Sequence, residues 1–156
     1  MINCEFEDGG KVSLRHAVVN SLVLKDGKIL MVKRSLKLLE GGKWGLAGGF
    51  ADRDETLKEA AEREILEETG WRVKDLQLLT IIDNPVSQRE DRQNISFVYF
   101  CTAVEQTGEA DWESDEQKWF SLTDLPSKDT IAFDHADCIE LYQNYLANNL
   151  SLPVTN

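Results

Sequence analysis

The chain has 156 residues, 42% of them hydrophobic, which is enough to bury a sizeable core, so we predict one globular domain over residues 1–156. Its net charge of −11 argues against a nucleic-acid partner, because proteins that bind nucleic acids gather basic side chains against the phosphates. We expect a cytoplasmic protein without a membrane partner, because the sequence has no apolar run of roughly 20 residues, no signal peptide, and an odd number of widely spaced cysteines.

The first third of the chain predicts a β-hairpin that follows an irregular start. Residues 1–11 are polar and are expected to form a loose or edge segment. Residues 15–24 are almost continuously apolar and β-branched, which indicates a buried strand, and residues 28–33 return as a second strand after an Asp-Gly turn. The glycine-rich loop at 35–44 lacks the Lys-Ser/Thr of a nucleotide-binding P-loop.

A short acidic helix follows a glycine-rich turn. Thr56 and Glu59 have the T-x-x-E spacing of a capping box, so the helix is expected to begin after Thr56. Gly70 stands where a left-handed residue would end it. The sequence therefore predicts a helix over residues 57–69.

Three carboxylates gather on one side of this helix. At about 100° per residue, Glu64, Glu67 and Glu68 fall within about 100° of one another. Such a cluster could be a solvated acidic face, or it could bind a hard divalent cation, since Mg²⁺ and Mn²⁺ prefer oxygen ligands. Arg63 is placed to pair with Glu59 or Glu67, four residues to either side, or with another carboxylate after folding.

Residues 49–71 resemble the signature of the Nudix hydrolases, G-x5-E-x7-R-E-U-x-E-E-x-G-U, where U is apolar. The positions that match are Gly49, Glu55, Arg63, Glu64, Ile65, Glu67, Glu68 and Gly70. Two positions depart from the family pattern: Trp71 replaces an aliphatic residue, and Ala47 stands where a proline is common in the preceding turn.

The resemblance implies an α/β fold in which a mixed sheet is sandwiched between helices and the signature forms a loop-helix-loop. It also implies a reaction, the Mg²⁺- or Mn²⁺-dependent hydrolysis of the pyrophosphate bond in a nucleoside diphosphate linked to another group. The implied metal ligands are Glu64, Glu67, Glu68 and a carbonyl of the Gly48-Gly49 turn, Gly49 being the one we select. Arg63 would orient the catalytic glutamates Glu64 and Glu68, while Glu55 and Gly70 would serve the structure of the motif.

The second half of the chain predicts three strands and a last helix. Residues 76–82, 95–104 and 118–122 have strand composition, and residues 134–148 show helical periodicity. Between them, 83–94 and 106–117 are expected to be polar loops. Some Nudix enzymes use a signature glutamate as general base and others use one from a later loop; Glu113 and Glu116 are the loop candidates here.

The substrate is indicated only by the loop after the third strand. Pro85 lies 15 positions after Gly70, near the distance typical of Nudix enzymes that cleave ADP-ribose. Arg89 and Arg92 in the same loop could contact a phosphate or ribose, or pair with neighbouring carboxylates. We therefore expect a small nucleotide such as ADP-ribose as the substrate, and a homodimer is possible. The alternatives are a nucleotide-sanitising pyrophosphohydrolase that acts on nucleoside triphosphates, and a metabolite-sensing Nudix domain without catalysis.

Overall fold

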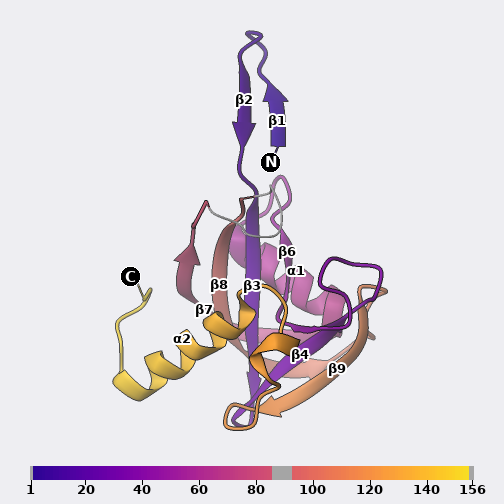
Figure 1. Ribbon diagram of the computed structural model, residues 1–156, viewed down its shortest axis with the longest axis vertical. Coiled ribbons are helices and arrows are strands. Elements are labelled where there is room, and N and C mark those ends of the chain that lie inside the picture. The colour runs from indigo at the N-terminus through magenta and orange to yellow at the C-terminus, as the bar shows by residue number, and fades with distance from the viewer. Residues whose placement is uncertain (1, 86–92, 155–156) are drawn as a thin grey trace.

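The computed structural model describes residues 2–85 and 93–154, and it places two helices on opposite faces of a mixed β-sheet (Figure 1). Helix α1 (Leu57–Thr69) lies behind the sheet in this view and α2 (His135–Asn148) lies in front of it. The strands are β1 (Ile2–Glu5), β2 (Lys11–Leu14), β3 (Ala17–Lys25), β4 (Lys28–Arg34), β5 (Trp44–Gly45), β6 (Ala47–Phe50), β7 (Trp71–Ile82), β8 (Ile95–Gln106) and β9 (Ser114–Ser121). A short 3-10 helix covers Lys128–Thr130.

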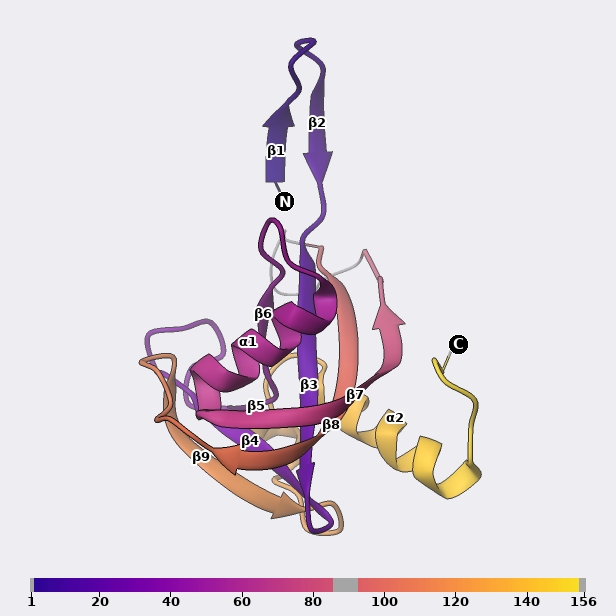
Figure 2. The ribbon, with the colours of Figure 1, turned by 180° about the vertical axis from the view of Figure 1, so that it is seen from behind.

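The sheet is built around the parallel pair β3 and β8. Its main order is β5-β4-β3-β8-β7, with β6 added to β3 and β9 to β4, and all pairs except β3·β8 are antiparallel. The central strands are apolar along most of their length because helices cover both of their faces, as Figures 1 and 2 show from opposite sides. The predicted sandwich of helices around a mixed sheet is confirmed.

Each helix closes a separate hydrophobic core on its own face of the sheet. On the α1 side, Ala61 and Ile65 pack among residues that include Val19. On the α2 side, Ile139 packs among residues that include Leu22. Side chains alternate along a strand, so β3 supplies residues to both cores and fixes the two helices relative to each other.

Two strands begin earlier in the chain than predicted. Strand β9 begins at Ser114, not at residue 118, and its acidic start lies against β4, where Lys33 faces Glu116. Strand β7 begins at Trp71, directly after the helix, because its first residues pair with the end of β8. The residues added to β9 are polar, so no alternating apolar pattern marks them. At the start of β7, the half-buried Trp71 and Val73 do alternate with the exposed Arg72 and Lys74, and the sequence prediction missed this pattern.

The N-terminal segment forms a hairpin, β1 and β2, that projects from the rest of the molecule (Figures 1 and 2). Its residues alternate, so that one face carries the paired Ile2 and Leu14 and the other carries Asn3 and Ser13, joined by a hydrogen bond of 2.7 Å. The prediction of a loose or edge segment at 1–11 was therefore too weak, since the segment is a regular two-stranded sheet.

In the described part of the chain, neither α-helix is long and apolar enough to cross a membrane.

Candidate active site

Helix α1 carries the acidic cluster, and its ends form as the sequence predicts. The Thr56 hydroxyl accepts from the Glu59 N–H at 3.3 Å, and the Glu59 carboxylate accepts from the Thr56 N–H at 2.7 Å. Gly70 ends the helix in the left-handed conformation, with a φ of 70°. The capping box and the glycine stop are thus confirmed. The predicted turn at Gly48 and Gly49 is instead part of strand β6, which pairs with β3.

Arg63 is the hub of the cluster. Its guanidinium donates to Glu55 at 2.8 and 3.1 Å, to Glu64 at 2.9 Å and to Glu67 at 3.1 Å. It also donates to the Phe50 carbonyl at 3.0 Å, which ties the helix to the end of β6. The hydrogen bonds from Arg63 and from a backbone N–H lower the pKa of Glu55 to about 2. Glu59, the other expected partner of Arg63, is occupied by the helix cap.

Glu68 and Glu64 lie deeper than the other acids of the helix. The Glu68 side chain is buried and accepts from the Gly48 N–H at 3.1 Å. Burial raises the pKa of Glu68 to about 8, and the carboxylates of Glu64 and Glu113 act in the same direction. Burial also raises the pKa of Glu64, although the neighbouring Arg63 opposes the shift. Without a cation, this pair of acids is held in an environment that disfavours its negative charge.

The residues at this site fit a hard divalent cation. The buried Glu68 and the partly buried Glu64 have raised pKa values, and a bound cation favours the charged form of both carboxylates. Gly49 lies so close to Glu64 that a methyl group on it would overlap the carboxylate, and only glycine leaves that space open beside the backbone. Among the described residues, no three acidic, histidine or cysteine side chains converge tightly enough to form a complete cage, so waters and substrate oxygens would complete the coordination.

The two loop glutamates lie in different places. Glu113 is half-buried, lines the same cavity as Glu64, and is near enough to raise the pKa of Glu64 and Glu68. Glu116 lies on β9 and pairs with Lys33 at 3.8 Å, with about half of its side chain exposed. Of the two candidates for the general base, only Glu113 is at the acidic cluster.

A cavity of about 1040 Å³ extends from the acidic cluster to the beginning of α2. Its lining includes Gly49, Glu64 and Arg63 of the signature together with Arg34 and Phe133. Arg34 is near enough to the acidic cluster for its charge to act on the pKa of Glu68. The strands β3, β7 and β8 supply a further part of the lining, including Asn20, Thr80 and Ser96. Signature residues and residues from the other end of the chain therefore face one continuous space.

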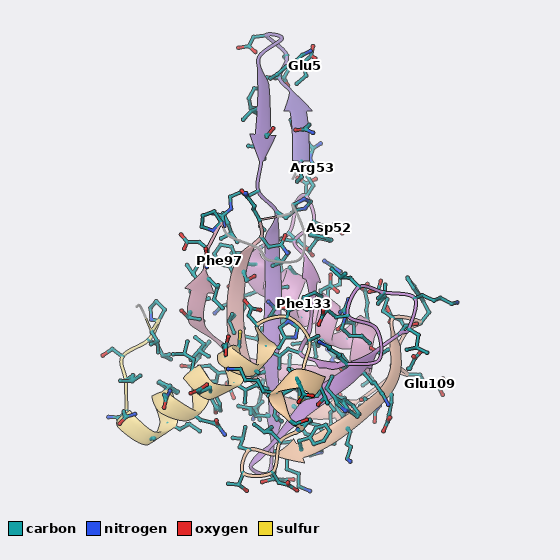
Figure 3. The ribbon with its side chains drawn as sticks, in the orientation of Figure 1. Glu5, Asp52, Arg53, Phe97, Glu109 and Phe133 are labelled. Carbon is teal, nitrogen blue, oxygen red and sulfur yellow. The ribbon has the colours of Figure 1, made fainter. Side chains whose placement is uncertain are left out.

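Phe133 and Arg34 form an aromatic and cationic wall of this cavity. Phe133 lies just before α2 near the centre of the molecule in Figure 3, and more than a third of it is exposed. Its φ of 54° is an unfavourable conformation for a bulky residue, and such strain persists where the surroundings hold it in place. The Arg34 guanidinium lies 4.9 Å from the Phe133 ring centre, while its Nε donates to the Leu39 carbonyl at 3.0 Å.

The buried His135 holds this wall against the sheet. Its Nδ1 accepts from the Leu46 N–H at 2.9 Å, and its ring meets Phe133 edge-on at 5.5 Å between centres. Burial lowers the pKa of His135 to about 3, so the ring is neutral at physiological pH and acts as an acceptor.

The substrate residues predicted from the loop after β7 are only partly covered by the structure. Pro85 is exposed, and it is the adjacent Asn84 that lines the cavity. Arg89 and Arg92 lie outside the described residues. Sequence reasoning missed Arg34 and Phe133, although a basic residue at the end of a strand and an aromatic residue at the start of a helix could have drawn attention to them.

Comparison with known proteins decides the family. The NUDIX domain model matches residues 14–142, most of the chain. The chain belongs to the Nudix hydrolase family. Members of this family act on small nucleotide compounds and generally use divalent metal ions.

Three relatives illustrate the range of the family. An ADP-ribose pyrophosphatase of Methanocaldococcus jannaschii is 35% identical over 128 residues, which cover 81% of this Nudix chain and 72% of that protein. An oxidized purine nucleoside triphosphate hydrolase of Danio rerio is 33% identical over 117 residues, or 72% of this chain and 70% of that protein. The Nudix domain of Shewanella oneidensis NrtR, solved in complex with ADP ribose, has a TM-score of 0.71 and 27% identity over 86% of this chain and 90% of that one.

Proposed function

We propose that this Nudix hydrolase cleaves the pyrophosphate bond of ADP-ribose, with Mg²⁺ or Mn²⁺, to give AMP and ribose 5-phosphate. The observation that carries the proposal is the continuous cavity, which joins the acidic cluster of α1 to the wall of Phe133 and Arg34. Its volume of about 1040 Å³ suits a nucleoside diphosphate sugar. The similarity to a named ADP-ribose pyrophosphatase supports the choice of substrate.

Glu64, Glu67, Glu68 and the carbonyl of Gly49 would hold the metal. Bound there, it would neutralise phosphate charge and lower the pKa of a coordinated water. Arg63 keeps Glu64 and Glu67 in place through its hydrogen bonds. The burial of Glu68 and the partial burial of Glu64 reduce the water around the carboxylates, which strengthens their attraction for a cation.

The other wall suits the nucleotide. The exposed face of Phe133 can stack on a purine, since aromatic rings bind nucleobases through their π-faces. Arg34 can donate to a phosphate with the nitrogens that do not contact Leu39. The chain as a whole is strongly acidic, so local cations are needed to offset the repulsion of an anionic substrate.

Glu113 is the general base in this proposal. Glu113→Gln should lower kcat about a hundredfold or more, because the positioned proton acceptor is lost, while metal affinity changes little. Glu116→Gln is the matched control, since Glu116 is exposed and pairs with Lys33 on a neighbouring strand. Steady-state kinetics and metal titrations of both variants test the assignment. Equal kcat values in the two variants and the wild type would move the base to a glutamate of α1.

The substrate assignment is tested by comparing kcat/KM for ADP-ribose with kcat/KM for a panel of nucleoside triphosphates, with products identified. We expect AMP and ribose 5-phosphate from ADP-ribose, at higher efficiency than any triphosphate. The second candidate, a triphosphate pyrophosphohydrolase, is supported by the similarity to the Danio rerio enzyme. Pyrophosphate release from a triphosphate at tenfold or greater efficiency would favour it, and tight binding of ADP-ribose without any turnover would favour a sensing domain. A homodimer and a cytoplasmic location stay predictions.

A further inference from the structure

Arg15 lies at the junction between the N-terminal hairpin and β3, outside the Nudix signature. Among the described residues, its guanidinium donates three hydrogen bonds, and all three acceptors are backbone carbonyls. Nε donates to Gln93 at 2.7 Å, and one Nη donates to Asp83 at 2.6 Å and to Asn94 at 3.1 Å. One side chain therefore joins the residue that follows β7 to the two residues that precede β8.

Two of these carbonyls belong to residues that line the cavity, and the third belongs to a neighbour of a lining residue. Gln93 and Asn94 line it, and so does Asn84, the neighbour of Asp83. We call these three residues the amide rim. Gln93 is in the left-handed conformation, with a φ of 50°, and Ile95 N–H donates to the His16 carbonyl at 2.7 Å. The rim is thus held to the start of β3 by charge-assisted bonds from Arg15 and by one backbone bond.

Asn94 has an unused acceptor. Its Oδ1 is buried, and within the described part of the chain it has no hydrogen-bond partner. A buried polar atom without a partner is costly, and such atoms persist where a ligand or water completes them. Because Asn94 lines the cavity, a bound nucleotide can supply the missing donor from a hydroxyl or an amino group.

We propose that Arg15 is a positioning residue that holds Asn94 in place to accept a hydrogen bond from the substrate. The inference rests on the proposed function, since it assigns a specificity contact within the same cavity. Arg15 and Asn94 act on binding and not on bond cleavage, because Asn94 offers the substrate a neutral amide and Arg15 reaches the cavity through backbone carbonyls.

The test compares Arg15→Met, Asn94→Leu and the double variant with the wild type. Asn94→Leu keeps the shape and removes the acceptor, so KM for ADP-ribose should rise about three- to tenfold with kcat nearly unchanged. Arg15→Met should raise KM at least as much. In the double variant KM should stay within about twofold of Arg15→Met, because the contact is already lost. Arg15→Lys, which keeps a charged donor, should give an intermediate KM.

The control is Arg72→Met, the same change at an exposed arginine near the start of β7. The cavity-lining Thr80 lies near the other end of that strand. Arg72→Met should leave KM unchanged. If the role of Arg15 were purely structural, Arg15→Met would lower the melting temperature. The factors by which the two single substitutions raise KM would then multiply in the double variant. Multiplied factors, or an unchanged KM in Asn94→Leu, would overturn the proposal.

Product inhibition identifies the donor. If Asn94 accepts from the adenine amino group, Asn94→Leu weakens inhibition by AMP but not by IMP. If Asn94 accepts from the adenosine ribose, the substitution weakens inhibition by both AMP and IMP. If it accepts from the terminal ribose, the substitution weakens inhibition by ribose 5-phosphate. No change with any of the three would refute the contact. If the wild type cleaves a triphosphate in place of ADP-ribose, the KM values of the same three variants are measured with that triphosphate. This comparison tests Arg15 independently of the proposed substrate.

Discussion

Glu68→Gln should lower turnover by about a thousandfold or more while the protein stays folded. The change removes a charged metal ligand of the proposed site, and a metal that clamps phosphates and activates water supplies several kcal/mol of transition-state stabilisation. The matched control is Glu62→Gln, which makes the same substitution at an exposed position of the same helix and should leave turnover unchanged. A Glu68→Gln enzyme with near wild-type turnover would contradict the site.

The stability of the same variant without metal should differ from that of the wild type in a pH-dependent way. The folded state holds the pKa of Glu68 at about 8, above its ordinary value, so the folded wild type binds a proton that the unfolded chain has lost. The wild type therefore loses stability as pH rises from about 4.5 towards 8, and glutamine avoids this loss. Metal-free Glu68→Gln should be more stable than the wild type at pH 8, with little difference at pH 4.5. Denaturant unfolding in the presence of a chelator measures both.

The two glycines Gly48 and Gly49, predicted to form a turn, lie in strand β6 and should respond oppositely to alanine. At Gly49 the added methyl group meets the carboxylate of Glu64, the far end of a flexible side chain that can move. Gly49→Ala should therefore abolish most of the activity, at least about a hundredfold, with less than about 1 kcal/mol lost in the free energy of unfolding. The loss arises because Glu64 is displaced from its place beside β6.

At Gly48 the methyl group meets backbone atoms of β3, the Val19 carbonyl oxygen and the Asn20 Cα. These atoms cannot move without separating β6 from β3, so Gly48→Ala should cost about 2 to 3 kcal/mol of stability. Unfolding curves and kinetics of the two variants separate the effects. Similar stabilities for both variants, or a fully active Gly49→Ala enzyme, would contradict the close packing of β6 against β3 and Glu64.

Local signals predicted α1 and its acidic cluster because they act over a few residues. The capping box needs only Thr56 and Glu59, and the helical repeat alone brings Glu64 and Glu68 to one side. The strand cores were also visible, since β3 and β8 are apolar along most of their length. The first part of β9 was missed because its pairing with β4 is a property of two distant segments.

The sequence by itself determined the position of the acidic helix and, through its resemblance to the Nudix signature, indicated the family and the sandwich of helices around a mixed sheet. It could not decide between Glu113 and Glu116, which are three residues apart in similar acidic surroundings. Only the register of β9 on β4 places Glu116 beside Lys33 and leaves Glu113 at the cavity. The convergence of Arg34, Phe133 and Asn94 on that cavity likewise depends on strand order, because contacts between residues far apart in the chain arise only when the sheet assembles.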